Sequence, residues 1–186
     1  TTGRQNSAFG NSALKFNTEG YDNAAYGYYS LIYNTTGEEN SAYGSHSLYS
    51  NTTGYMNVAM GAYSMYSNTS GYLNVAIGQN SLRENTTGAV NNAVGVGALY
   101  SNTTGYANNS LGYLALYNNT EGFRNTATGV LALYSNTTGS FNAAFGDYSL
   151  YSNTTGEANV AIGGMALYTN SGSYNSALGS LAGYYN

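Results

Sequence analysis

The sequence of 186 residues contains no cysteine, no proline and no tryptophan, and it has few charged side chains. Without cysteine, a disulfide framework and a thiolate metal site are both excluded. Only 6% of the residues are charged, against about 25% in an ordinary soluble domain. The four basic residues and the net charge of −4 do not suit a phosphate backbone, so we expect no nucleic-acid partner. No run of about 20 apolar residues occurs, so we expect no membrane insertion.

Glycine, in contrast, is abundant, and its spacing reveals an internal repeat of 17 residues. One glycine series runs from Gly3 to Gly156 in steps of 17, and a second runs from Gly10 to Gly163. One residue is missing near 171, which places the corresponding glycines of the last repeat at Gly172 and Gly179. We interpret residues 1–186 as a single array of eleven repeats, because a fixed period of this length is typical of solenoids.

We number the repeat positions from 1 to 17, starting at the first glycine, so that Gly54–Ser70 is one repeat. Position 4 is asparagine in all eleven repeats, position 6 is alanine except for Ser110, and position 12 is leucine except for Met65 and Gly183. Position 7 is large and apolar except for Thr128. Every charged residue falls at position 2, 3, 9, 13, 14 or 17. Positions 4–8 and 10–12, which carry no charge, are therefore predicted to be buried.

Each repeat has the pattern of two short strands and two turns. Positions 3–8 alternate in the manner of a β-strand, and positions 10–13 are predicted to form a second strand that turns its leucine inward. The glycine at position 8 and the Asn-Thr-Thr-Gly run supply the turns, since asparagine bonds to nearby backbone and glycine accepts a positive φ. The sequence predicts an all-β fold, a parallel β-solenoid (β-roll) of about eleven coils stacked about 4.8 Å apart.

A single coil is too small to be stable alone, because burial of a few large side chains does not offset the entropy of ordering its backbone. We therefore expect stability to come from stacking and from association with further chains. The alanine column at position 6 has two interpretations at this point. It either forms an outer face that another backbone approaches closely, or it fills a narrow solenoid interior.

The repeats resemble the head repeats of YadA-type trimeric autotransporter adhesins and the repeats of tail-fibre-domain proteins of phages and bacteria. The adhesin repeats carry a Ser-Val-Ala-Ile-Gly core, which is matched after its first residue by Asn74–Gly78 and Asn159–Gly163. Asn-Thr-Thr-Gly punctuates the coils of the tail-fibre repeats. This resemblance covers the whole chain and implies a left-handed parallel β-roll, three chains about a common axis, and a role in a surface fibre. The adhesin repeats are shorter than 17 residues, and position 5 here is often polar, as at Asn92.

The residues give little support to catalysis. A translational repeat arranges like residues in columns, whereas catalytic mechanisms need different groups that converge on one point. We interpret His46, the only histidine, as a surface or half-buried ring, and Glu38 and Glu39 as a solvated pair. The sequence therefore predicts no enzyme, no catalytic or metal-binding residues, and no cofactor.

Tyrosine recurs at position 13 and is the most prominent candidate contact surface. Aromatic columns stabilise solenoids by stacking along the axis, and they also offer apolar platforms to sugar rings or neighbouring chains. Stacking is the simpler interpretation, and contact with a cell-surface glycan or receptor is the functional one. The column comprises Tyr49, Tyr66, Tyr100, Tyr117, Tyr134, Tyr151 and Tyr168, and it continues at Tyr184.

Two further columns raise alternatives. Asn-x-Ser/Thr sequons recur on the period, but coils about 4.8 Å apart leave no room for a sugar on each, so turn formation is the preferred interpretation. The threonine column that includes Thr35 and Thr52 is similar to the rows of ice-binding solenoids, although adjacent threonines would not share one flat face. The candidate glycosylation sites on the period are Asn34, Asn51, Asn68, Asn85, Asn102, Asn136 and Asn153.

These features predict a structural and interaction module, the rod of an extracellular trimeric fibre of a surface adhesin or phage tail fibre. The alternative is a self-assembling extracellular filament, glycosylated or not, and an ice-binding solenoid is the third candidate. The expected partners are copies of the chain itself, as a homotrimer or as an end-to-end or lateral filament, and then a cell-surface glycan or receptor. Since no atypical capping repeat is evident, we expect a fragment of a longer fibre or a unit that stacks end to end.

Overall fold

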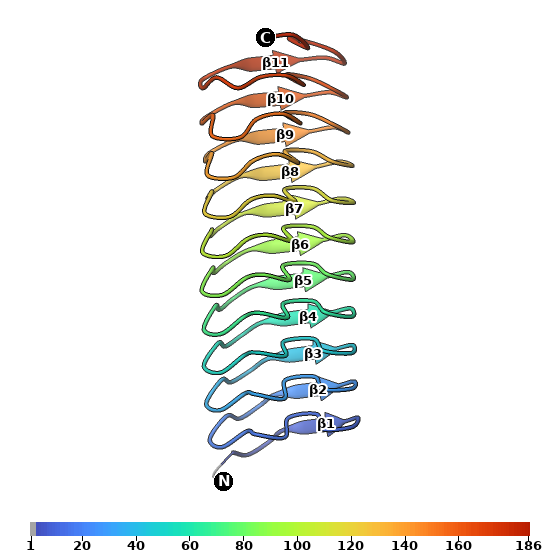
Figure 1. Cartoon of the computed structure of the whole chain (residues 1–186), viewed down its shortest axis with the longest axis vertical. Helices are drawn as coiled ribbons and strands as arrows, with labels where there is room; N and C mark the ends of the chain where they lie inside the picture. Colours follow the sequence, from blue (N-terminus) through green and yellow to red (C-terminus); the bar gives the residue numbers. More distant parts are fainter. Residues whose placement is uncertain (1–2) are drawn as a thin grey trace.

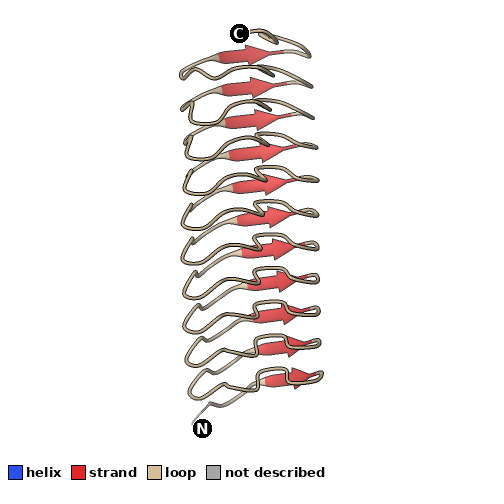
Figure 2. Cartoon of the chain, in the orientation of Figure 1, coloured by secondary structure: helices blue, strands red, loops and turns tan. Residues whose placement is uncertain are grey.

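The structure is a computed structural model that describes residues 3–186. These residues form an all-β parallel solenoid, in which each repeat makes one coil (Figure 1). Each coil contributes one strand of three residues, and the strands pair in sequence order into a single parallel sheet along one wall (Figure 2). The strands are β1 (Ser7–Phe9), β2 (Ala24–Tyr26), β3 (Ser41–Tyr43), β4 (Val58–Met60), β5 (Val75–Ile77), β6 (Asn92–Val94), β7 (Asn109–Leu111), β8 (Thr126–Thr128), β9 (Ala143–Phe145), β10 (Val160–Ile162) and β11 (Ser176–Leu178).

The register of the sheet follows the repeat. Ala59 of β4 pairs with Ala76 of β5, which pairs with Ala93 of β6, so that position 6 stacks on position 6. The register is kept even where a residue is missing, since Val160 of β10 pairs with Ser176 of β11. The sheet therefore stays in step, and the turn between these two strands is the part that is shortened.

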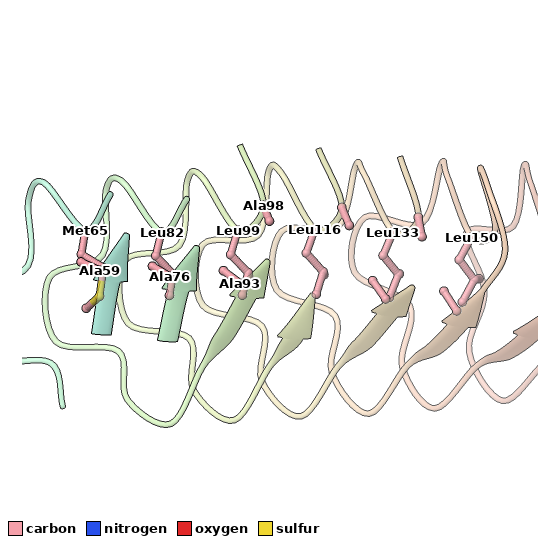
Figure 3. Packing of buried hydrophobic residues seen from close by; sticks show 14 of the residues in the cluster. Ala59, Met65, Ala76, Leu82, Ala93, Ala98, Leu99, Leu116, Leu133 and Leu150 are labelled. Carbon is pink, nitrogen blue, oxygen red and sulfur yellow. The ribbon is translucent and has the colours of Figure 1, made fainter. Parts of the chain in front are cut away.

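The core lies between this strand wall (positions 3–8) and the opposite turn wall (positions 9–14). Alanine at position 6 and leucine at position 12 point toward one another from the two walls (Figure 3). Ala76, Leu82, Ala93 and Leu99 are all fully buried. The alanine column thus fills a narrow interior. The alternative, in which it forms an outer contact face, is excluded because these side chains have no exposed surface.

The second strand predicted at positions 10–13 is wrong: within residues 3–186, no strand lies on the turn wall. The backbone φ is positive at position 10, as in Tyr63 (58°), and again at position 12, as in Met65 (50°). Repeated positive φ coils the backbone instead of extending it. The turn wall is still bonded from coil to coil, since the Met65 amide donates to the Ser81 carbonyl at 3.0 Å. Backbone hydrogen bonds therefore hold the coils together on both walls.

The strand on the first wall is also shorter than predicted, because both of its ends have positive φ. Position 3 is left-handed, with φ of 53° at Met56, and Gly61 at position 8 has φ of 137°. A Cβ on Gly61 would lie 2.6 Å from the carbonyl oxygen of Gly78 in the next coil. Glycine is therefore required at this corner, where the backbones of successive coils approach closely.

Two columns of buried asparagine join the coils at the other turn. At position 4, Asn57 Oδ1 accepts from the backbone amide and the Nδ2 of Asn74, at 3.1 and 3.2 Å. At position 15, Asn68 Nδ2 donates to Asn51 Oδ1 at 2.8 Å. Both columns also donate to one carbonyl, that of Gly71, at 2.8 and 3.1 Å. The interior at this turn is thus polar but hydrogen-bonded, as buried amides must be.

The residue missing near 171 interrupts the second of these asparagine columns. The Oδ1 of Asn153 is buried and has no hydrogen-bond partner among the residues that the structure describes. The Nδ2 of Asn170, one coil later, donates to the Gly172 carbonyl at 3.1 Å. The shortened turn therefore weakens the contact between these two coils without changing the strand register.

Candidate interaction surfaces

The tyrosine column at position 13 forms a ladder on the outside of the turn wall. Tyr134, Tyr151 and Tyr168 stack with centroid separations of 5.3 and 5.1 Å and planes within 5° of parallel. Tyr49 and Tyr66 stack in the same way at 4.8 Å. The rings are half-buried and cover one another's faces. Structural stacking thus accounts for the column, and the rings present their edges rather than their faces to a ligand. Tyr100, Tyr117 and Tyr184 continue the same stacking.

Arg83 stands in this ladder between Tyr66 and Tyr100. Its guanidinium carbon lies 5.6 Å from the Tyr66 ring centroid and 5.4 Å from that of Tyr100. The same group donates a hydrogen bond to the Tyr100 hydroxyl and pairs with Glu84 at 2.9 Å. A planar cation stacks on aromatic faces, so Arg83 replaces the missing ring and keeps the column continuous.

His46 lies within an aromatic cluster at the same wall. Its ring is half-buried and stacks on Tyr63 with a centroid separation of 5.0 Å and an interplanar angle of 8°. The Ser45 hydroxyl lies 2.8 Å from His46 Nδ1. Nearby, the pKa of Tyr49 is raised to about 12, chiefly by a hydrogen bond with Tyr33 and to a smaller extent by desolvation. No group of three or more His, Cys, Asp or Glu side chains that could hold a metal ion occurs within residues 3–186.

The asparagines of the seven sequons lie inside the coil. In each, Nδ2, the atom that would carry a glycan, is already hydrogen-bonded: Asn102 Nδ2 donates to the Gly105 carbonyl at 3.0 Å and to Asn85 Oδ1 at 2.9 Å. A sugar could be attached only by opening the coil. The bond to the glycine three residues on agrees with turn formation. The fully buried sequon residues are Asn34, Asn51, Asn68, Asn85, Asn102, Asn136 and Asn153.

The threonine column is bonded to the backbone of the next coil. Thr52 Oγ1 donates to the Thr69 carbonyl at 3.0 Å, and Thr69 Oγ1 donates to the Thr86 carbonyl at 3.1 Å. Thr35 makes the same contact with Thr52. These hydroxyl protons are not free to bond water, which does not favour an ice-binding row.

One surface was misassigned from the sequence and lies on the outside of the sheet. Position 7 was predicted to be buried, but Met60 is 44% exposed, Ile77 39% and Phe145 42%. Position 6 is buried, so alternation along the strand points positions 5 and 7 outward, and position 3, just before the strand, is exposed as well, as at Leu73. The prediction is likewise wrong at positions 5 and 8, and at position 10, where Tyr63 is 37% exposed. The alternation in the strand already contained this information, because an inward alanine at position 6 requires position 7 to face out.

We call positions 3, 5 and 7 of all coils the outer sheet face. It runs the length of the rod and carries few charges, at Asp22, Glu39 and Arg124 only. Eleven coils at about 4.8 Å give a face roughly 50 Å long, and the three-residue strand alone makes it roughly 10 Å wide. Its area is at least on the order of 500 Å² per chain, the same order as the roughly 800 Å² per partner of a standard stable interface. Exposed apolar surfaces of this size mark interaction sites.

Comparison with protein-family models, with curated proteins and with solved structures finds no match to the chain. Among residues 3–186, no helix has the length and apolar character needed to cross a membrane. The surfaces of the solenoid, above all the outer sheet face, are therefore the features that bear on function.

Proposed function

We propose that the chain forms the rod of an extracellular fibre in which three copies lie side by side about an axis parallel to the solenoid. The rod acts mechanically, by spacing or presenting a binding surface, as in a surface adhesin or a phage tail fibre. The extracellular setting and the number of copies rest on the resemblance of the repeats to those two kinds of protein.

The observation that carries this proposal is the exposed, nearly uncharged outer sheet face. In coils that include β4 and β5, this face is entirely apolar and consists of methionine, leucine, valine and isoleucine. Only three of the twelve charged residues occupy it. A solenoid that stays single in water gains nothing by excluding charge from such a face, whereas burial of the face against another copy explains the exclusion.

The experiment compares charge substitutions on the two walls. Ile77→Glu places a carboxylate on the outer sheet face, and Tyr63→Glu is the matched control, since its side chain is equally exposed on the turn wall. We expect wild-type chain and Tyr63→Glu to sediment with the mass of three 19.5 kDa chains, and Ile77→Glu to sediment as a monomer with an unchanged circular dichroism spectrum.

Three results would contradict the proposal. A wild-type chain that stays monomeric at high concentration would remove side-by-side assembly altogether. An Ile77→Glu variant that keeps the wild-type mass would show that the outer sheet face is not the contact. A polymer whose length grows with concentration would favour the self-assembling filament instead.

A further inference from the structure

Polar side chains occur together at the two edges of the outer sheet face, positions 3 and 7. Numbering the coils by their strands, position 3 is charged only in coils 2, 3 and 8, and position 7 bears a hydroxyl only in the same three coils. In coils 4–7, 9 and 10, both positions are occupied by purely apolar side chains. The three polar pairs are Asp22 with Tyr26, Glu39 with Tyr43, and Arg124 with Thr128.

Contact within one chain does not explain this pairing. Position 3 precedes the strand and position 7 ends it, so the two lie four residues apart along the chain, on the order of 10 Å at about 3.3 Å per residue. Asp22, Glu39 and Arg124 are exposed, as are Tyr26 and Tyr43. Within the chain, the Tyr26 ring instead stacks on Tyr43 of the next coil, with ring centroids 5.0 Å apart. The two columns share a polarity pattern although they do not touch.

We propose that position 3 of one copy contacts position 7 of a neighbouring copy at the same level of the rod. This inference rests on the proposed side-by-side assembly. A three-fold axis parallel to the rod keeps each coil at its own height, and the strands of successive copies follow one another in the same sense around the axis. The position-3 edge of one copy then meets the position-7 edge of the next. Antiparallel rods would instead bring position 3 against position 3 of a different coil.

The chemistry of the pairs suits this contact. The Asp22 and Glu39 carboxylates would accept hydrogen bonds from tyrosine hydroxyls of the neighbour, and the Arg124 guanidinium would donate to a threonine hydroxyl. In the apolar coils, Leu73 would meet Ile77 of the neighbour. Each charge thereby enters the interface opposite a hydrogen-bonding group, which avoids the cost of burying it unpaired.

The pairs would also select the register of the copies. A repetitive rod offers nearly the same contacts at every shift of about 4.8 Å, so the fold alone does not choose among them. The polar coils are numbers 2, 3 and 8, whose unequal spacing means that only zero shift aligns all three. A shift by one coil would set Arg124 against Leu111 or Phe145, which leaves a charge against hydrocarbon. The pairs thus act by disfavouring the wrong registers.

Disulfide cross-linking tests the contact directly, because the chain has no cysteine of its own. Leu73→Cys chains and Ile77→Cys chains, distinguished by different tags, are mixed, refolded together and oxidised. We expect the mixed disulfide between residues 73 and 77 to exceed, by at least several-fold, the Leu73→Cys homodimer. The matched control pairs Leu73→Cys with Val94→Cys, which lies one coil further along, and it should cross-link several-fold less.

The cross-linking result and the sedimentation result separate the pairing from the assembly. If the chains sediment as an oligomer but the homodimer or the one-coil-shifted disulfide predominates, the pairing is overturned and side-by-side assembly stands. If the wild-type chain is a monomer, assembly and pairing both fall. A second variant checks the register: with Arg124→Leu and Thr128→Leu added to every chain, we expect the shifted disulfide to increase several-fold. An unchanged ratio would show that this pair does not select the register.

Discussion

The strand wall and the turn wall of each coil both send side chains into the interior, yet they differ in how they cover their outer surfaces. On the turn wall, tyrosines such as Tyr134 and Tyr151 stack along the rod at 5.3 Å. On the strand wall, Met60 and Ile77 follow the same repeat but remain 44% and 39% exposed. The coil spacing of about 4.8 Å falls in the range at which aromatic rings stack. The turn-wall tyrosines therefore bury part of one another's ring faces, whereas the aliphatic side chains of the strand wall have no such stacking.

The largest effect should come from Gly78, where the strand wall turns into the turn wall. Its φ is +131°, and a Cβ would lie 2.5 Å from the Gly95 carbonyl oxygen. We expect Gly78→Val to lower the free energy of unfolding by at least about 3 kcal/mol or to prevent folding, because strain and backbone clash add. Urea denaturation measures the change.

Gly164→Ala is the control for this substitution, since a Cβ there meets no atom closer than 3.9 Å. Its free energy of unfolding should change by less than about 0.5 kcal/mol. Equal losses for the two variants would mean that the positive φ and close packing at Gly78 do not determine its contribution to stability.

The next largest effect is expected at position 12 of the turn wall, and it is compared with position 6 of the strand wall. Leu99→Ala removes a large side chain that the turn wall inserts between the walls, and we expect a loss of about 3 kcal/mol. Ala93→Gly removes only a methyl group from the strand wall and should cost about 1 kcal/mol. Both residues are fully buried. Chemical denaturation of both variants measures the two losses. A larger loss for Ala93→Gly would contradict the view that the leucine of the turn wall fills most of the apolar core.

A smaller effect separates the two outer columns. Tyr134 stacks on rings above and below it, so Tyr134→Ala should lower the free energy of unfolding by about 1–2 kcal/mol. Ile162→Ala on the strand wall should cost less than about 1 kcal/mol in a dilute, monomeric sample. The assembly should respond in the opposite sense, with weaker self-association for Ile162→Ala only. Sedimentation across a concentration series tests this, and equal weakening by both variants would remove the distinction between the columns.

The smallest effect is on the pH dependence of the turn wall. The hydrogen bond with Tyr33 and desolvation raise the pKa of Tyr49 to about 12, above its ordinary value of 10.0. A group with a raised folded-state pKa keeps its proton more firmly when folded, so its contribution is complete below pH 10 and is lost as the pH rises toward 12. Denaturation midpoints measured from pH 9 to 12 should fall, and they should fall less in Tyr33→Phe. An identical pH profile for that variant would refute the role of the hydrogen bond.

Periodicity predicted much of the fold because it depends on local patterns. The inward leucine at Leu99 and the glycine corner at Gly78 both follow from the 17-residue spacing. The second strand failed because nothing local to Met65 indicates positive φ for a side chain of that kind. A left-handed conformation costs an ordinary residue about 1–2 kcal/mol. It is adopted here because burial and the hydrogen bond to Ser81 in the next coil outweigh that cost.

The outer sheet face could be predicted only in part, because absence of charge has two causes. Asn57 and Ala59 lack charge because they are buried in the coil, whereas Met60 lacks it while remaining exposed. The sequence alone treats the two cases alike. The sequons show the opposite case, in which a buried residue has the sequence of an exposed one. The motif at Asn102 is that of a glycosylation site, but its Nδ2 donates both of its hydrogen bonds in the interior of the solenoid.

The sequence by itself determined the period, the parallel stacking, the residues that line up in columns and the exclusion of cysteine chemistry, because these depend on spacing and composition. The tertiary structure decided which wall is a sheet, which asparagines are buried and which uncharged face is left open. Those properties depend on contacts between coils, where Gly61 approaches Gly78 and Asn57 bonds to Asn74. Contacts of this kind form 17 residues away along the chain, beyond the reach of any local pattern.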